Sequence, residues 1–390
     1  MIRGLCGAHE FNGERNQTVN TSRKDFLKFG ASAAALAASA GLTGCETLTE
    51  EQAIARKKFA GLETLGPVMP ELEVRNSGLK GRVACKYVDD VIWFLRDIAR
   101  TRPKSIFDHP YLRGFRKVHE ETGLKVQFNL FYRTDFFYGM DEFTLADMPA
   151  DYKAEFQANA DWIKFGFHSL QEFPDYPWIN ADYADVEKCL GMIRREIVRF
   201  AGDNMFARAL IPHWVPISKD GVRALADAGI KIVYATVGTR YAYNGDASTL
   251  PYGHAFRLVN NRKRETALFT RNSYMAELAC SICGYNHIDS AQNSRVRTVA
   301  KYLYDPVTKM GFRDFCTRPM SCINIHSIPK LKECLDEVKD AEFVGYGNHE
   351  QYFFKDYLAY QPEYMEKEML AARTLKERGH RFIFMEELVG

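Results

Sequence analysis

The chain lacks a surplus of charge of either sign. It has 52 basic and 50 acidic residues among 390, and residues 45–390 alone carry 47 of each. Domains that bind nucleic acid usually carry a clustered basic excess, so we expect no nucleic-acid partner. The sequence also contains no G-x-G-x-x-G motif. Its absence removes the main reason to expect an open dinucleotide-binding sheet.

Long apolar runs are scarce. The run from Phe29 to Leu42 is shorter than the about 20 residues that a membrane-spanning helix needs. It follows the charged segment 21–28 and precedes Leu42-Thr-Gly-Cys45. A charged segment, an apolar segment and a small-residue cleavage site are the parts of an export signal. We therefore expect residues 1–44 to be a signal peptide that is not part of the fold.

Two details of this segment resemble known export motifs. It is similar to a twin-arginine signal in which Lys24 replaces the second arginine, and general secretion stays open as the alternative. The run ending in Cys45 resembles a lipobox, which implies a lipidated Cys45 and an exported, membrane-anchored lipoprotein of the periplasm or cell surface. Residues 45–75 are then a tether, and residues 76–390 are long enough for one barrel domain.

The cysteines say little about disulfide pairing or metal binding. Seven follow Cys45, an odd number that cannot all pair within one chain. Cys280 and Cys283, with His287 nearby, could form a small metal site or a redox pair. A structural zinc site needs a second pair of ligands at a suitable spacing, and none is clear. A disulfide or buried thiols is therefore the preferred interpretation.

Strand-like apolar runs alternate with segments of helical periodicity from residue 82 onward. In the clearest helix, Val186, Leu190, Ile193, Ile197 and Phe200 share one face. Such alternation predicts an α/β fold, a parallel sheet with crossover helices. The expected strands are 82–88, 125–131, 160–167, 207–211, 230–235, 321–325, 341–345 and 381–385. The other expected helices are 91–100, 111–121, 219–228 and 362–378. Residues 236–310 show no clear pattern and are expected to contain an insertion.

Residues able to do chemistry follow several of these strands. Active sites of β/α barrels lie at the C-terminal ends of the strands, so this placement favours a barrel. The residues concerned are Asp89, Asp90, Arg133, Asp135, His168, His213, His326, His349 and Glu350. Adjacent carboxylates repel each other when ionised and so raise each other's pKa. A metal ion bound beside Asp89 and Asp90 would offset that repulsion. One carboxylate would bind the ion and the other would act as a base.

The order of these elements resembles the polysaccharide deacetylase, or NodB-homology, family. The matching segments are Tyr87-Val-Asp-Asp90, Phe167-His-Ser-Leu-Gln-Glu172, Gly347-Asn-His-Glu-Gln-Tyr352 and the run from Leu375 to Leu388. The resemblance implies a distorted (β/α) barrel and a divalent metal ion, with zinc expected. It implies a hydrolase that removes acetyl groups from a carbohydrate substrate. Asp89 would be the general base, and Asp90 and His168 would be metal ligands. From the chemistry of amide hydrolysis we expect His349 to protonate the departing amine as general acid.

The chain departs from that family at two places. Glu172 stands where the family has its second histidine, and the usual Arg-x-Pro is replaced by Leu-Ile-Pro-His-Trp at 210–214. A catalytic zinc site needs three protein ligands. His213, behind a rigid proline at a strand end, is the first candidate for the third ligand. Glu172, one helical turn from His168, is the second.

Other roles stay open at this stage. His326 competes with His349 as general acid. Arg133, Trp214 and Tyr352 could bind or stack on sugar rings, and a structural role is an equal alternative for each. Two other functions remain: an exported sugar-binding lipoprotein without activity, and a glycoside hydrolase that uses Asp89 with Glu350.

Overall fold

A computed structural model of the chain describes residues 72–134, 142–172, 177–178, 181–237, 284–288, 290–317, 320–357 and 360–390. All belong to one compact unit, Leu48–Gly390. The expected export signal, Cys45, Asp135 and the Cys280–Cys283 pair lie outside the described residues. None of the helices in the described segments is long and apolar enough to cross a membrane.

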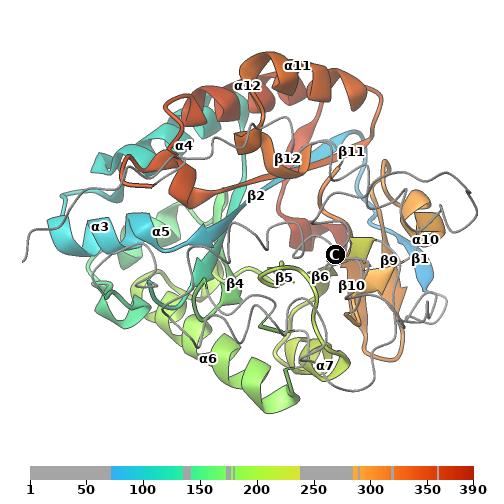
Figure 1. The fold of residues 1–390 in the computed structure, drawn as a ribbon, viewed down its shortest axis with the longest axis horizontal. Coiled ribbons are helices and arrows are strands. Elements are labelled where there is room, and N and C mark those ends of the chain that lie inside the picture. Colours follow the sequence, from blue (N-terminus) through green and yellow to red (C-terminus); the bar gives the residue numbers. More distant parts are fainter. Residues whose placement is uncertain are drawn as a thin grey trace, which may run out of the picture. The chain divides into compact units, whose positions relative to one another are not determined.

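The described part is an α/β structure with two main sheets (Figure 1). The first sheet has the order β11-β2-β3-β4 and is parallel throughout, and β12 also pairs with β2 in parallel. Its strands are β2 (Val83–Val91), β3 (Val126–Phe131), β4 (Ile163–Ser169), β11 (Phe343–His349) and β12 (Arg381–Ile383). The register of β11 on β2 runs from Phe343 opposite Val83 to His349 opposite Asp89. This register brings two of the predicted catalytic residues side by side.

The second sheet has the order β1-β9-β10-β6-β5. Strands β5, β6 and β10 are parallel, whereas β9 is antiparallel to both β10 and β1. Its strands are β1 (Glu73–Asn76), β5 (Ala209–Leu210), β6 (Ile232–Tyr234), β9 (Lys301–Asp305) and β10 (Met310–Arg313). The short strands β7 (Thr236–Val237) and β8 (His287–Ile288) form a separate parallel pair.

Helices cover the strands, and several begin at a side chain that accepts a main-chain N–H. Asp182 accepts from Asp185, Ser218 from Gly221 and Ser327 from Lys330, as N-cap residues do. The α-helices are α3 (Trp93–Thr101), α4 (Pro110–Thr122), α5 (Lys153–Ala158), α6 (Tyr183–Phe200), α7 (Lys219–Asp227), α10 (Ser290–Ser294), α11 (Ile328–Glu337) and α12 (Tyr364–Glu377). The 3-10 helices are η1 (Ile106–Asp108), η3 (Leu145–Asp147), η4 (Asp203–Met205), η7 (Met320–Ile325), η8 (Glu350–Phe353) and η9 (Met385–Leu388).

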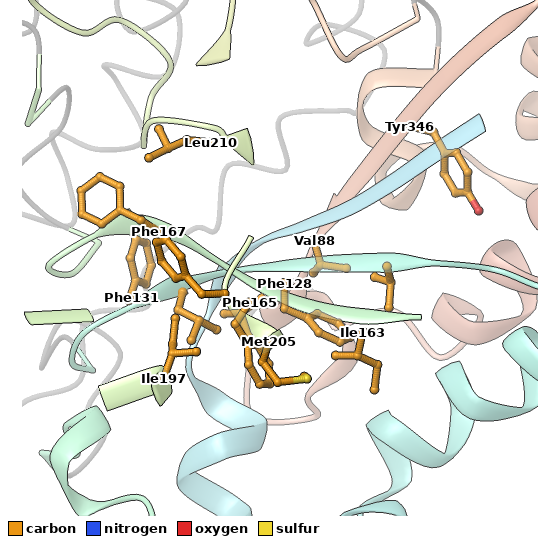
Figure 2. Close-up of a cluster of buried hydrophobic side chains, with 14 of the residues drawn as sticks. Val88, Phe128, Phe131, Ile163, Phe165, Phe167, Ile197, Met205, Leu210 and Tyr346 are labelled. Carbon is orange, nitrogen blue, oxygen red and sulfur yellow. The ribbon is translucent and has the colours of Figure 1, made fainter. Parts of the chain in front are cut away.

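Apolar side chains pack on both faces of the first sheet. Figure 2 shows one cluster, in which Val88, Phe128 and Phe165 lie with Ile197 of α6. On the other face of β2 the alternate residues Val83, Cys85 and Tyr87 belong to a second cluster with side chains of the other sheet. A parallel sheet is normally covered on both faces. The predicted apolar face of α6 is confirmed as buried, since all five of its residues are at most 2% exposed.

The expected strand at 321–325 is wrong. Met320–Ile325 is the 3-10 helix η7, kinked at Cys322 (φ −151°, ψ 78°). The place beside β11 is taken by an earlier segment, because the N–H of Thr317 donates to the carbonyl of Gly345 at 2.9 Å. Strand β9 and the first residue of β10 lie in the region 236–310, for which the sequence predicts an insertion.

Candidate metal centre

A bulge in β2 points its two adjacent aspartates at different partners. The pairing of β2 with β3 shifts between Val88 and Val91, and Asp90 has a φ of 60°. Left-handed backbone is uncommon outside glycine, and aspartate is among the residues that tolerate it. Asp89 accepts a hydrogen bond from the side-chain amide of Asn129 at 2.7 Å, whereas Asp90 faces two histidines. The bulge thus separates the two carboxylates.

Asp90, His168 and His213 form a buried group that could hold a metal ion. The Oδ1 atom of Asp90 lies 3.2 Å from Nε2 of His168 and 3.4 Å from Nδ1 of His213. The two ring nitrogens are 3.0 Å apart. Ligand atoms of a tetrahedral zinc ion, with bonds of about 2.0–2.1 Å, are roughly 3.3 Å from one another. The three atoms therefore have the size of one face of such a site.

The outer nitrogens of the two imidazoles face main-chain carbonyls. Nδ1 of His168 lies 2.7 Å from the oxygen of Ile211, and Nε2 of His213 lies 2.7 Å from the oxygen of Glu172. A carbonyl only accepts, so each ring donates its N–H outward and in the neutral form turns a lone pair inward. Two lone pairs and a carboxylate oxygen then meet, which is unfavourable without a cation or a proton between them. Metal-bound histidines are commonly supported in this way.

The pKa values of these groups follow from their burial and their closeness to one another. Burial tends to raise the pKa of Asp90, but the charge of His349 and the hydrogen bonds of His168 and His213 outweigh it and hold that pKa well below its usual range. Burial raises the pKa of Asp89, and the neighbouring Asp90 charge adds to that rise. Asp90 is thus held in its ionised form, and Asp89 is more basic than an ordinary aspartate.

The two histidines of the group behave differently. Burial lowers the pKa of His168, but the charges of Asp89 and Asp90 outweigh it and raise that pKa. Burial lowers the pKa of His213, and a positive His168 beside it lowers it further. Protonation of both rings at once is therefore disfavoured.

His349 lies at the end of β11, at the edge of the group. Its Nε2 atom is 3.8 Å from Oδ2 of Asp90, and its Nδ1 atom is 3.4 Å from the sulfur of Cys322. Burial lowers the pKa of His349, but Cys322 and Asp90 outweigh it and raise that pKa to about 10. Its side chain is 35% exposed, so a protonated imidazole is accessible from outside.

Four further side chains support the site, and the sequence reasoning missed them. Gln351 donates to Oδ2 of Asp90 at 2.9 Å, Asn129 orients Asp89, and Cys322 contacts His349. The ring of Phe131 lies 4.9 Å from that of His213 and 5.4 Å from that of His168. Asn129 could have been found as a polar residue inside an apolar run. Cys322 gave no such signal, because it reaches the site only through η7.

The other residues that the sequence predicts for the site make different contacts. Glu172 is buried and touches His213 through its main-chain carbonyl. The Nε atom of Arg133 donates to Gln171 at 2.5 Å. Tyr352 packs against Tyr357, with ring centroids 5.1 Å apart. His326 is buried directly after η7.

Trp214 follows His213 in the chain, and their ring centroids are 5.7 Å apart. Glu350 is fully buried and accepts the main-chain N–H groups of Ile92, Trp93 and Phe94 at 2.7–2.8 Å, which ties it to the start of α3.

No protein-family model, curated protein or solved structure matches the chain. Its chemistry has to be inferred from this geometry.

Proposed function

We propose that the protein is a metal-dependent hydrolase that removes acetyl groups from a carbohydrate, as a divergent polysaccharide deacetylase. The observation that carries this proposal is the meeting of three inward-facing ligand atoms, from Asp90, His168 and His213. A basic aspartate, Asp89, lies next to them in the chain, and a protonated imidazole, His349, lies within 4 Å of Asp90. A base and an acid on either side of a metal centre suit the hydrolysis of an amide.

The proposed fold is a distorted (β/α) barrel, and two sets of main-chain contacts between the sheets support it. On one side, Ala207 donates to Phe165 at 2.8 Å, and His213 donates to His168 at 3.3 Å. On the other side, Thr317, which follows β10, donates to Gly345 of β11. Both edge strands of the first sheet, β4 and β11, are thereby joined to segments next to the second sheet. The candidate ligands lie at or just beyond strand ends, where barrel enzymes carry their sites.

A divalent ion bound by these three ligands, zinc being the expected one, would polarise an acetyl carbonyl and acidify water. Asp89 would take the proton of the attacking water. Its Oδ1 atom is already held by Asn129, so Oδ2 is the oxygen expected to accept that proton. His349 would donate its Nε2 proton to the departing sugar nitrogen as the carbon–nitrogen bond breaks. The products are acetate and an amine.

The surroundings of Glu350 make a glycoside hydrolase the weaker alternative. Both of its oxygens accept main-chain N–H groups of α3, so it is not placed to act with Asp89. An exported sugar-binding lipoprotein without activity is separated from the proposal by experiment. Anchoring through a lipid on Cys45 remains part of the proposal.

The test combines metal analysis with an acetate-release assay on N- and O-acetylated glycans. We expect wild type to bind stoichiometric metal and His168→Ala to lose it. Asp89→Asn should keep the metal and lose about 10²–10⁴-fold in turnover, because a general base contributes that much. Glu172→Gln is the matched control and should keep its metal, since Glu172 contacts His213 through the main chain.

Two outcomes would count against the proposal. Equal metal content in wild type and His168→Ala would exclude this centre. Stoichiometric metal with glycan binding but no acetate release would favour the sugar-binding protein.

A further inference from the structure

The turn that carries His213 has a strained backbone. Trp214 and Val215 have φ angles of 59° and 77°. Left-handed backbone is a genuine outlier for a β-branched residue such as valine. The N–H of Val215 donates to the carbonyl of Pro212 at 2.7 Å and closes the turn. Such strain persists only where surrounding groups hold the backbone in place.

Asn286 supplies those surrounding contacts from a distant part of the chain. Its Nδ2 atom donates to the carbonyls of Val215 and Tyr234, each at 2.8 Å, and its Oδ1 atom accepts the N–H of Ile217 at 3.1 Å. The side chain is fully buried. Two carbonyls at one end and an N–H at the other allow only this orientation of the amide. Asn286 therefore ties the strained turn to the end of β6.

We propose that Asn286 is a positioning residue for the metal centre. It holds the turn from His213 to Ile217 in the conformation that aims Nδ1 of His213 at Nε2 of His168. The hydrogen bond from His213 to Glu172 orients only the ring, so the direction of the side chain depends on the turn. Without Asn286, Val215 can relax to an ordinary extended conformation and take His213 with it. This inference rests on the proposed metal centre.

The test measures zinc affinity by competition with a chromophoric chelator, without any assay of activity. Asn286→Ala and Asn286→Ser should each weaken zinc binding by about 10- to 100-fold, as loss of the groups that orient a metal ligand does. Asn159→Ala is the matched control. Asn159 also bonds through its side chain, to Glu155 and Trp162, but it precedes β4 at the end away from His168. We expect it to keep wild-type zinc affinity.

A second variant separates positioning from a general loss of structure. Glycine holds a φ near 77° without help, so Val215→Gly should restore most of the zinc affinity that Asn286→Ala or Asn286→Ser loses. Wild-type affinity in both single Asn286 variants would overturn the inference, and so would a complete failure of Val215→Gly to rescue. If wild type binds no more zinc than His168→Ala, the proposed function fails instead. If Asn286→Ala does not fold, the zinc affinities of Asn286→Ser with and without Val215→Gly provide the same test.

Discussion

At the scale of single residues, the cysteines show how surroundings set reactivity. The five cysteines in the described segments are not joined in disulfides, and four of them are buried. Burial raises the pKa of Cys85 and of Cys189 to about 12. Cys322 is only partly buried and lies beside His349. Because the thiolate is the reactive form and must be reached, these thiols should differ sharply in reactivity.

We predict that iodoacetamide at pH 8 modifies Cys322 in the folded protein and spares Cys85 and Cys189. With a pKa near 12, roughly one in 10⁴ of the buried thiols is ionised at pH 8, and that fraction rises about tenfold for each pH unit up to the pKa. Peptide mass mapping measures the labelling of each site. Labelling in urea is the control, where the three thiols should react alike. Equal labelling of Cys85 and Cys322 in the native protein would contradict the prediction.

At the scale of elements, a buried charge pair fixes α12 over the first sheet. Nζ of Lys86, on β2, lies 3.1 Å from Oε1 of Glu368, on α12, and 2.8 Å from Oδ1 of Asn348, on β11. Both charged side chains are fully buried. Burial lowers the pKa of Lys86 and raises that of Glu368, while each charge opposes the shift of the other. The pair joins β2 to α12, and Asn348 adds β11, whose next residue is His349 of the candidate site.

Removing one charge of this pair should cost more than removing both. Lys86→Met leaves Glu368 buried without its partner and should lower the free energy of unfolding by about 3–5 kcal/mol. The double variant Lys86→Met with Glu368→Leu should lose less. Urea unfolding of the wild type, both single variants and the double variant gives the coupling. Strictly additive losses would show that the pair is not coupled.

The stability of the Lys86→Met variant should depend on pH. Burial raises the pKa of Glu368 above 4.5, and Lys86, which opposes that rise, is gone in Lys86→Met. Above pH 4.5 the unfolded chain ionises this carboxyl while the folded protein still binds the proton. Stability should therefore fall as pH rises from 4.5. Unfolding midpoints between pH 4 and pH 8 measure this, and adding Glu368→Leu should remove the trend.

The sequence predicts elements well where local signals decide and poorly where a distant partner does. The helix at 183–200 shows one apolar face, and the strands at 126–131 and 163–169 carry a large apolar residue at every second position. By contrast, the segment 321–325 is a short, mostly apolar run that predicts a strand, yet the edge of β11 is already occupied. Short runs of this kind do not reveal which segment will pair.

The residues of the candidate site likewise include some that local sequence signals predict and others that only the fold reveals. Asp89, Asp90, His168, His213 and His349 could be proposed because each lies at or near the end of an expected strand. Asn129, Gln351 and Cys322 contact those residues, Asn286 bonds to the turn that follows His213, and only the fold brings them together. The choice of His213 over Glu172 as third ligand likewise depends on where the turn after β5 points the imidazole.

At the scale of the whole described unit, the candidate site depends on how the two sheets join. Asp90 and His168 come from the first sheet, whereas His213 follows β5 of the second. At β11, the other edge strand of the first sheet, Gly345 and Thr317 are joined by two hydrogen bonds of 2.9 Å each. The N–H of Thr317 donates to the carbonyl of Gly345, and the N–H of Gly345 donates to the hydroxyl of Thr317. Disturbing that edge should therefore destabilise the fold as a whole.

Gly345→Ala tests this joint directly. A Cβ atom on Gly345 would overlap the main-chain carbonyl of Phe315, which cannot rotate away as a side chain can. The strand and its neighbour must separate, so we expect a loss of about 3 kcal/mol or more, at the upper end for overpacking. Gly191→Ala is the control: nothing lies within 4 Å of its Cβ position on α6, and alanine should gain about 1 kcal/mol in a helix. Urea unfolding measures both. If Gly345→Ala is as stable as wild type, the sheets do not meet at Gly345, and the proposed barrel should be abandoned.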